Sequence, residues 1–276
     1  MRLRASITPK LLADLIALLK FYPKDEFVIC FAQDKFSFCV VQGAFGGIWV
    51  ECDLDKVFQG YDFSSKYDNK MLLRMDSAAL ASALASDEKN NPIKLKLAPG
   101  KNGAFLQFIH SPLDKSKILR HNVQINFLKT QMINSYAEPD YQATMAACLP
   151  PLSSLKLWCA NAVNISKNVT ISIIRNSETE ETEVVFHVES ESHLVSISTH
   201  YHHMEIPNSS ADETLFDSDN TQCEVTVDLK RFNKILKVDS LRPQSSQLFI
   251  KDKTSLRVSF DVEYATIAQH LAGITS

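Results

Sequence analysis

The sequence predicts an α+β protein that is built from two similar domains. A short pattern of strand, capping aspartate, helix and returning strand occurs twice, around Asp76 and Asp228, which lie 152 residues apart. A repeat of this kind indicates a duplicated structural unit. The chain has 276 residues, and two domains of about 130 residues each can bury most of their apolar surface without disulfides or metals.

The first half is predicted to be rich in strands. Residues 2–7 alternate as a strand, and Thr8 is placed to cap a helix that runs to about residue 21. Residues 59–69 are predicted to be a loose connection. The first copy of the repeat then gives a strand at 70–74, a helix at 77–86 and a strand at 93–97. The other predicted strands are 26–31, 35–41, 47–53, 105–110 and 121–128, so the first domain comprises residues 1–128.

The alternation stops between Lys129 and Gln142, where polar residues and a proline predict an interdomain connector of residues 129–142. The second domain, residues 143–276, repeats the order of elements. It begins with a strand at 143–148 and a helix from Pro151 to about residue 164. The second copy of the repeat gives a strand at 224–227, a helix at 229–237 and a strand at 247–250. The other predicted strands are 169–174, 183–188 and 194–199.

The helix at 229–237 has a basic side. Lys230, Lys234 and Lys237 recur at i, i+4 and i+7, with Arg231 beside them, and the core stripe lies opposite. Two interpretations are open: a solvated surface, or a surface that faces phosphates. Like charges at i and i+4 cost a few tenths of a kcal/mol when they have no partner, which favours the second interpretation.

The other predicted helices differ in charge. Lys10 and Lys20 lie opposite the leucine stripe of the first helix, and Lys156 and Lys167 share a side in the helix that follows Pro151. The helix after Asp76 exposes only small neutral residues. Three of the four helices therefore carry basic residues and one does not.

Composition sets limits on function. The net charge is −3, with 45% hydrophobic and 22% charged residues, so contact with nucleic acid would need a local basic face. The six cysteines have no regular spacing and are predicted to be buried, reduced thiols. The N-terminus lacks a signal-peptide pattern and no apolar run approaches the length of a membrane span, which leads us to expect an intracellular, soluble protein.

Motifs for catalysis or cofactor binding are weak. The glycines at 43–47 lie between two strands and indicate a turn rather than a phosphate cradle. His200 and His202 would share one side of a strand while His203 faces the other, and no cysteine or carboxylate has ligand spacing with them. Cys159 falls on the core side of its helix, which disfavours a nucleophilic thiolate. We therefore expect no catalytic residue, no metal ligand and no cofactor.

Several stretches, taken in order, resemble a known family. They are MRLRASI, DKFSFCVV, IWVECDLDKVFQGYDF, LRMDSAALASALASDEKNNPIKLKL, NISKNVTISI, LVSISTHYHH, VDLKRFNKILK and DVEYATIAQHLAG. Their order and spacing are similar to those of the sliding clamps related to proliferating cell nuclear antigen, and most similar to the Hus-type subunit of the heterotrimeric nine-one-one checkpoint clamp. The resemblance covers nearly the whole chain.

The resemblance implies a DNA-clamp fold with two similar domains, each with antiparallel sheets and two helices that face a central pore. The basic residues that it places toward double-stranded DNA are Lys10, Lys20, Lys156, Lys167, Lys230, Arg231, Lys234 and Lys237. It implies two free sheet edges that pair with neighbouring subunits, through His121, Val123, Ile125 and Phe127 on one edge and Leu194, Ser196 and Ser198 on the other. It also implies a groove for partner proteins, formed by Met132, Ile133, Tyr136, His270, Leu271 and Ala272.

The implied function is that of a non-enzymatic subunit of a ring loaded at damaged DNA, which serves as a platform for checkpoint signalling and repair. The implied partners are two other clamp-like subunits, an ATP-driven clamp loader, and checkpoint and repair proteins, without a membrane. The implied location is the nucleus, and the cytoplasm for the unassembled chain. A homotrimeric replicative clamp, a protein-interaction scaffold without DNA and an unrelated two-domain enzyme are the alternatives.

Overall fold

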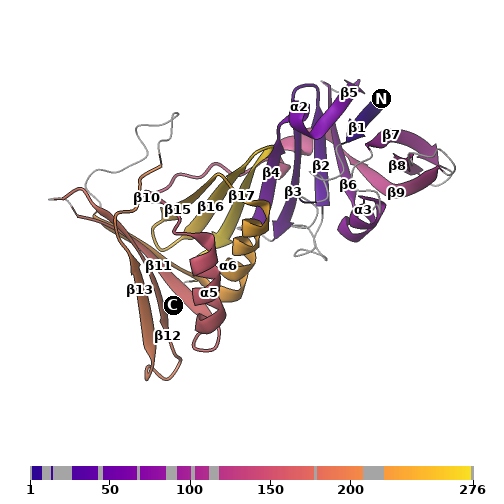
Figure 1. The fold of residues 1–276 in the computed structure, drawn as a ribbon. Helices are drawn as coiled ribbons and strands as arrows, with labels where there is room; N and C mark the ends of the chain where they lie inside the picture. Colours follow the sequence, from indigo (N-terminus) through magenta and orange to yellow (C-terminus); the bar gives the residue numbers. More distant parts are fainter. Residues whose placement is uncertain are drawn as a thin grey trace. The chain divides into compact units, whose positions relative to one another are not determined.

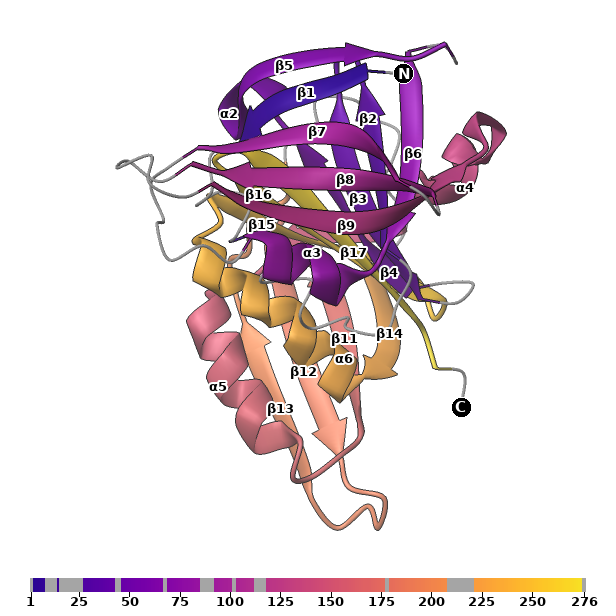
Figure 2. The same cartoon turned by 90° about the vertical axis from the view of Figure 1, so that its right-hand side faces the viewer.

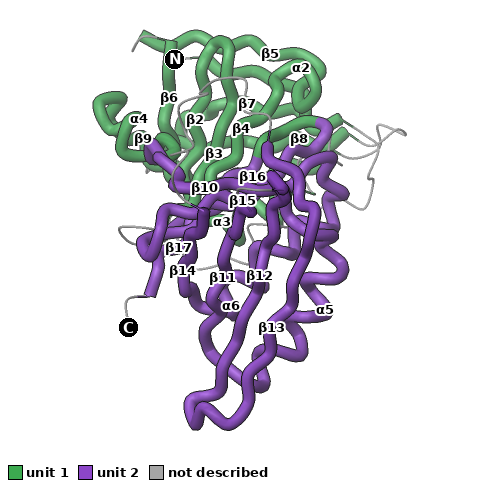
Figure 3. The backbone as a smooth tube through the Cα atoms, turned by 90° about the vertical axis from the view of Figure 1, so that its left-hand side faces the viewer, with its two compact units in different colours: residues 1–42, 48–138, 264–266 green, residues 43–47, 139–263, 267–276 purple. Residues whose placement is uncertain are grey.

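The computed structural model describes residues 2–7, 14, 27–42, 46–66, 69–84, 92–100, 103–111, 118–176, 179–207 and 221–274. Strands predominate over helices in these residues (Figure 1). The chain divides into two compact units (Figure 3). Unit 1 comprises residues 1–42, 48–138 and 264–266, and unit 2 comprises residues 43–47, 139–263 and 267–276. The chain passes from the long segment of unit 1 to that of unit 2 between Glu138 and Pro139, which lie inside the connector expected at 129–142.

Nine strands follow one another across unit 1 in the order β4-β3-β2-β6-β9-β8-β7-β1-β5. The registers of β2 with β3 and β6, of β6 with β9, and of β9 through β8, β7 and β1 to β5 are antiparallel. The bounds are β1 (Arg2–Ile7), β2 (Phe27–Ala32), β3 (Phe36–Gln42), β4 (Gly46–Cys52), β5 (Phe58–Ser64), β6 (Lys70–Met75), β7 (Ile93–Gly100), β8 (Gly103–His110) and β9 (Leu119–Leu128).

Aromatic rings fill the core of unit 1. Phe36 lies at the centre, with ring centroids 5.2 Å from Phe31, 5.1 Å from Phe58 and 6.3 Å from Phe38. Helix α3 (Ser77–Leu84) closes this core with Leu80, which is buried. Burying each such ring contributes about 2–3 kcal/mol, so the packing of side chains on the inner faces of these strands stabilises unit 1.

The prediction of a loose connection at residues 59–69 was wrong for its first part. A single helical turn, α2 (Leu54–Val57), leads into β5, which pairs with β1 from Arg2 opposite Ser64 to Ile7 opposite Phe58. The polar residues hid three aromatic residues, Phe58, Tyr61 and Phe63, whose rings contact one another along the strand, Phe58 with Tyr61 and Tyr61 with Phe63. Aromatic residues favour strands, and these three account for a strand where the composition indicated a turn.

Unit 2 contains two groups of strands. One has the order β10-β15-β16-β17 and the other is a four-stranded antiparallel sheet with the order β13-β12-β11-β14. The bounds are β10 (Met145–Cys148), β11 (Asn168–Arg175), β12 (Thr182–Glu189), β13 (Ser196–Tyr201), β14 (Gln222–Asp228), β15 (Ser245–Lys251), β16 (Ser255–Val262) and β17 (Ala265–Ala272).

Two helices lie side by side on one face of the four-stranded sheet (Figure 2). Both α5 (Leu152–Ala162) and α6 (Leu229–Ile235) contact the buried ring of Phe186 on β12, through Trp158 at 5.7 Å and Phe232 at 5.8 Å. Because these faces of α5 and α6 pack on the sheet, the opposite face of each helix is left on the outside. The helix predicted at 229–237 ends as an α-helix at Ile235 and tightens into a 3₁₀ segment, η2 (Leu236–Leu241), before the left-handed Arg242.

The repeat predicted around Asp76 and Asp228 is present in the structure. Each aspartate lies at the end of a strand and caps a helix with the same bond. Asp76 Oδ1 accepts from the backbone N–H of Ala79 at 2.7 Å, and Asp228 Oδ1 accepts from that of Arg231 at 2.7 Å. Each cap satisfies one of the N–H groups that a helix start leaves without an internal partner. The duplicated pattern in the sequence is therefore a duplicated backbone arrangement.

The segment between the units contains η1 (Thr130–Met132) and the helical turn α4 (Ile133–Tyr136). Ile133 and Tyr136 pack on a small cluster that includes the buried Leu72 of unit 1. On the other side, the Tyr141 hydroxyl donates to the carbonyl of Ser255 at 2.7 Å and accepts from the N–H of Lys251 at 3.0 Å. Each end of the segment is thus fixed to its own unit.

Candidate nucleic-acid and subunit interfaces

Helix α6 presents basic side chains opposite its packed face. Its buried residues are Leu229, Phe232 and Ile235, which the contact with Phe186 holds inward. Lys230, Arg231 and Lys234 are exposed, and within the described residues none of the three forms an ion pair. Three cations held close together without acids make a local positive surface, which is what phosphate binding requires.

Two other predicted DNA contacts are already paired within unit 2. Lys156 Nζ lies 2.9 Å from Asp239 Oδ2 of η2, and Lys167 Nζ lies 2.7 Å from Glu191 Oε1. The hydrogen bond to Glu191 raises the pKa of Lys167. Lys167 also lies beyond α5, which ends at Ala162, so it is not on the helix face where the sequence placed it. The carboxylate beside each lysine lowers the local positive potential, so a phosphate is attracted less strongly to it.

The remaining predicted contacts are Lys237, which is exposed on η2 directly after α6, and Lys10 and Lys20. Lys10 and Lys20 lie outside the described residues. Of the first predicted helix, the structure describes only Asp14. The outer face of α3 has Ala78, Ala79 and Ser82 exposed and no charged residue between Ser77 and Leu84. The described helices therefore differ as the sequence predicted, with a basic α6 and a neutral α3.

Strand β9 is an edge along only part of its length. It pairs with β8 from Leu119 to Ile125, but Phe127 lies opposite Leu73 and is paired with β6, so the predicted free edge from 121 to 128 is wrong at its C-terminal end. Val123 and Ile125 are buried in the core of unit 1 and His121 is half-buried. Side chains alternate between the two faces of a strand, and those of Val123 and Ile125 point into the core. What this edge can offer to a neighbouring subunit is therefore its backbone groups.

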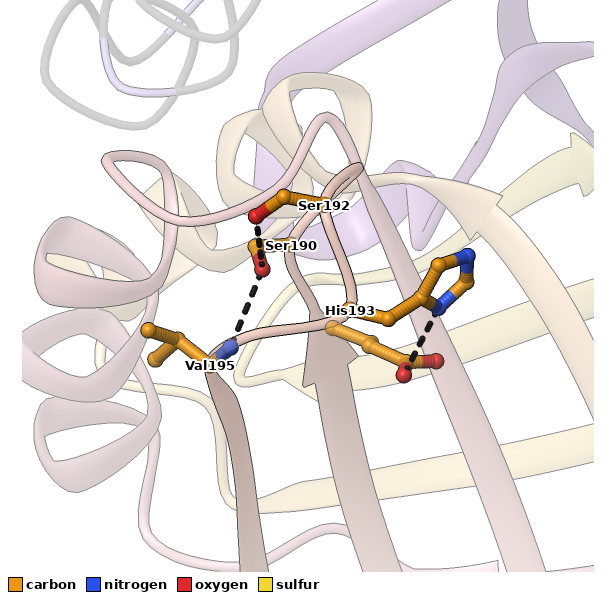
Figure 4. A network of polar contacts seen from close by, with 5 residues as sticks. Ser190, Ser192, His193 and Val195 are labelled. Carbon is orange, nitrogen blue, oxygen red and sulfur yellow. Dashed lines mark hydrogen bonds and ion pairs between the residues drawn. The ribbon is translucent and has the colours of Figure 1, made fainter.

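Strand β13 is the edge of the four-stranded sheet and pairs only with β12 among the described strands. Leu194 is 85% exposed just before it, and Val195 and Ile197 are also exposed. Figure 4 shows the turn that leads into β13, where Ser190 Oγ accepts from the N–H of Val195 at 3.1 Å. Ser196 and Ser198 are exposed on the strand itself. An unpaired edge with exposed aliphatic residues is typical of a surface that a partner completes.

The residues predicted to form a partner groove lie in different units and differ in exposure. Met132 is exposed, whereas Ile133 and Tyr136 are half-buried on the cluster around Leu72. His270 and Leu271 are buried in unit 2, where the His270 ring meets that of Tyr141 at 5.3 Å, and Ala272 is half-buried. Because packing inside unit 2 already covers His270 and Leu271, neither side chain is open to a partner.

The histidines at the end of β13 and just after it have carboxylate partners that sequence spacing did not predict. His200 Nδ1 lies 2.7 Å and His202 Nδ1 lies 3.3 Å from Glu183 Oε1, which β12 brings alongside. Glu183 lies 17 residues before His200, so the spacing of residues near the histidines gives no sign of this carboxylate. No group of three potential metal ligands with suitable geometry occurs in the described residues.

The cysteines form no disulfide, and all six are free thiols. Burial raises the pKa of Cys159 to about 12, so this thiol remains protonated near neutral pH. Among the described residues, no helix has the length and apolar character that a membrane-spanning segment requires.

A search against family models matches residues 1–273 to the family described as Hus1-like protein. The chain belongs to the Hus1-like family. A curated relative, the checkpoint protein hus1 homolog of Dictyostelium discoideum, is 26% identical over 242 residues, which cover 86% of this chain and 85% of the relative. Among solved structures, the proliferating cellular nuclear antigen of Entamoeba histolytica superposes with a TM-score of 0.71 at 12% identity and covers 99% of both chains.

These comparisons confirm two predictions from the sequence. The resemblance to the Hus-type subunit corresponds to the Hus1-like family, and the predicted clamp fold corresponds to the structural similarity over nearly the whole chain. At 12% identity the structural similarity bears on the fold alone. The Hus1-like chain is therefore a clamp-fold protein of mostly antiparallel strands.

Proposed function

We propose that this chain is one subunit of a heterotrimeric, ring-shaped checkpoint clamp that is loaded at damaged DNA. The observation that carries the proposal is the match to the Hus1-like family over residues 1–273. The name of the Dictyostelium relative, a checkpoint protein, supports the same role. Within the ring, residues 1–128 and 143–276 act as the two clamp domains, and residues 129–142 connect them.

Ring closure is proposed to use the two strand edges. The N-terminal part of β9 offers backbone groups along residues 119–125, and β13 offers its backbone together with Leu194 and Ile197. Pairing each edge with a strand of a different clamp-like subunit would satisfy the open hydrogen-bonding groups and cover the aliphatic side chains. Both edges would then be protected from uncontrolled association.

DNA contact is proposed to fall mainly on α6. Lys230, Arg231 and Lys234 carry charge that no described carboxylate neutralises, whereas Lys156 is paired with Asp239. A ring is retained on DNA by topology, so a few phosphate contacts suffice and a net charge of −3 is no obstacle. The chain itself acts as a scaffold without catalysis, and an ATP-driven loader, checkpoint proteins and repair proteins act on it. Its working location is the nucleus, with the unassembled chain in the cytoplasm.

The proposal is tested by assembly. The purified chain alone should elute from gel filtration as a monomer, and a pull-down from cells should recover two other clamp-like chains in equal amounts. Ile197→Asp, which places a charge on the β13 edge, should lower recovery of one partner and leave the other. Leu157→Asp is a matched control, because Leu157 is 68% exposed on α5 and belongs to neither edge strand.

A trimer of the chain alone would contradict the proposal and favour a homotrimeric replicative clamp. Equal loss of the partner in the Ile197→Asp and Leu157→Asp variants would contradict the role of the β13 edge. Recovery of other proteins, without any clamp-like chain, would indicate a scaffold outside a ring.

A further inference from the structure

A second basic surface lies on the sheet of unit 1. Five strands of this unit, β5, β1, β7, β8 and β9, lie side by side (Figure 2). Their inward side chains, among them Leu3, Leu95, Phe108 and Val123, are buried in the core. Side chains alternate along a strand, so the residues between these form the opposite, outer face of the sheet. This outer face belongs to unit 1 alone, whereas α6 belongs to unit 2.

Four exposed cations gather on the outer face. Arg4 of β1 lies directly opposite Lys96 of β7, and Lys94 precedes Lys96 by two residues, so it shares the same face. Arg120 of β9 is opposite Ile109 of β8, which is itself opposite Lys94. Neighbouring strands are about 5 Å apart, so the backbones at Lys94 and Arg120 are separated by about 10 Å.

None of these four cations forms an ion pair with a described residue. Asp62 of β5 is opposite Arg4, but its carboxylate lies 2.8 Å from the guanidinium group of Arg2. Like charges that face each other across neighbouring strands are destabilising, and Arg4 faces Lys96 in this way. A bound polyanion would remove this repulsion, so the arrangement favours a ligand with several negative charges.

An aromatic ring lies on the same face as the cations. Phe105 of β8 is opposite Ala98 of β7, two residues beyond Lys96. The ring lies across the backbone of Gly100, because a Cβ added to this glycine would come within 1.9 Å of Phe105 Cε2. Phe105 is half-buried, so part of the ring remains open to solvent. A side chain larger than hydrogen at position 100 would displace the ring from this place.

Amide side chains lie next to the ring and the cations. Gln107 is opposite Lys96 on one side and Asn122 on the other, and its Nε2 donates to Asn122 Oδ1 at 2.7 Å. Amide groups can also donate to and accept from the edges of nucleotide bases. Cations that attract phosphates, together with an aromatic ring on which a base can stack, are the groups with which proteins bind single-stranded nucleic acid.

Other polyanions fit this surface less well. An acidic peptide would be attracted by the cations but would gain no stacking on Phe105. The bases of a duplex are already paired and stacked on one another, so they are not available to the ring. The combination of cations, amides and an open ring therefore favours a single strand.

We propose that the outer face of this sheet binds single-stranded DNA. Phosphates lie against Arg4, Lys94, Lys96 and Arg120, and one base stacks on Phe105. The proposal goes beyond the clamp function, because binding requires neither ring closure nor the basic residues of α6.

The test uses the purified full-length chain and a fluorescein-labelled deoxythymidine oligomer of about 12 nucleotides, a length within the range that single-strand binding domains cover. We expect saturable binding by fluorescence anisotropy at about 50 mM salt. The Lys230→Gln, Lys234→Gln variant should bind the oligomer within about 2-fold of the wild-type chain. With this α6 variant, a DNA duplex of equal length and an oligoglutamate peptide of equal charge should each bind more weakly by on the order of 10-fold.

Variants of the outer face locate the binding. Each phosphate contact on a single strand contributes about 0.7 to the slope of log affinity against log salt concentration, so Lys94→Gln with Lys96→Gln should lower the slope by about 1.4. Lys251→Gln with Lys253→Gln is the matched control, since it removes the same charge from an exposed turn of unit 2 and should leave the slope unchanged. Phe105→Leu should weaken binding by on the order of 10-fold, while Phe105→Tyr, which keeps the ring, should bind as the wild-type chain does.

Several results would overturn the proposal. They are failure of the oligomer to saturate, equal slopes for the Lys94→Gln, Lys96→Gln variant and its control, and equal binding by the leucine and tyrosine variants of Phe105. Loss of binding in the α6 variant would place the single strand on α6. Equal or tighter binding of oligoglutamate would identify an acidic peptide as the ligand, and tighter binding of a uridine RNA oligomer would identify RNA. None of these results depends on ring assembly, so the proposed clamp function is tested separately.

Discussion

The exposed lysines of α6 give the sharpest test of how the proposed clamp meets DNA. The perturbation is Lys230→Gln with Lys234→Gln, which removes two charges one helical turn apart and leaves the packed face of α6 unchanged. The matched control is Lys251→Gln with Lys253→Gln, which removes the same charge from the exposed β15–β16 turn of the same unit. A difference between these variants reports position rather than net charge.

The expected magnitude follows from the number of contacts. Each phosphate contact contributes about 0.9 to the slope of log affinity against log salt concentration, so two lost contacts lower the slope by about 1.8. Between about 50 and 200 mM salt, this change corresponds to about 12-fold in affinity. Lys156→Gln should have a smaller effect on the slope, because Asp239 already lies 2.9 Å from its ammonium group.

The assay is fluorescence anisotropy of a labelled duplex with the assembled complex at several salt concentrations. Adding lysines to the neutral face of α3, with Ala78→Lys and Ser82→Lys, should steepen the slope by a similar amount if α3 also faces DNA. Equal slopes for the α6 variant and the β15–β16 control would refute the assignment of α6. A Lys156→Gln effect as large as that of the α6 variant would refute the argument from pairing.

Three further predictions concern the fold. Asp76→Ala and Asp228→Ala should each lower the free energy of unfolding by about 1 kcal/mol, measured by urea denaturation, while the asparagine variants should lose much less because asparagine also caps. Tyr141→Phe should cost about 1–3 kcal/mol by the same assay, since it leaves the carbonyl of Ser255 and the N–H of Lys251 without this partner. Stability should also fall as pH rises above about 9. Burial raises the pKa of the Cys39, Cys159 and Cys223 thiols to about 12, so the unfolded chain releases protons first and each thiol removes up to about 1.4 kcal/mol per pH unit until its folded pKa is reached. A flat profile between pH 9 and 11, or a serine variant of Cys159 with an unchanged pH dependence, would contradict the last prediction.

Local patterns in the sequence predicted the parts of the fold that local chemistry decides. The caps at Asp76 and Asp228 were predictable because a capping side chain bonds to a backbone N–H three residues away. The inward faces of α5 and α6 were predictable from helical spacing. By contrast, β5 was missed because its stability comes from pairing with β1, more than 50 residues earlier in the chain, which no local pattern records.

The same distinction applies to the candidate site. The exposed lysines of α6 could be predicted, since their position follows from the helix itself. The pairing of Lys156 with Asp239 and of His200 with Glu183 could not, because each joins residues that the fold brings together from distant positions.

The two copies of the repeat show which features of the unit are constrained and which are not. In both copies the capping aspartate and the buried positions of the helix are retained, since the core and the helix start depend on them. The outward positions are not constrained by packing, and here the copies differ: Ala78 and Ser82 on α3, but Lys230 and Lys234 on α6. A homotrimer would repeat this asymmetry three times, whereas a heterotrimer allows the neighbouring subunits to supply basic residues elsewhere in the ring. The uneven charge of this chain is therefore better suited to a subunit that shares DNA contact with different partners than to one that forms the ring alone.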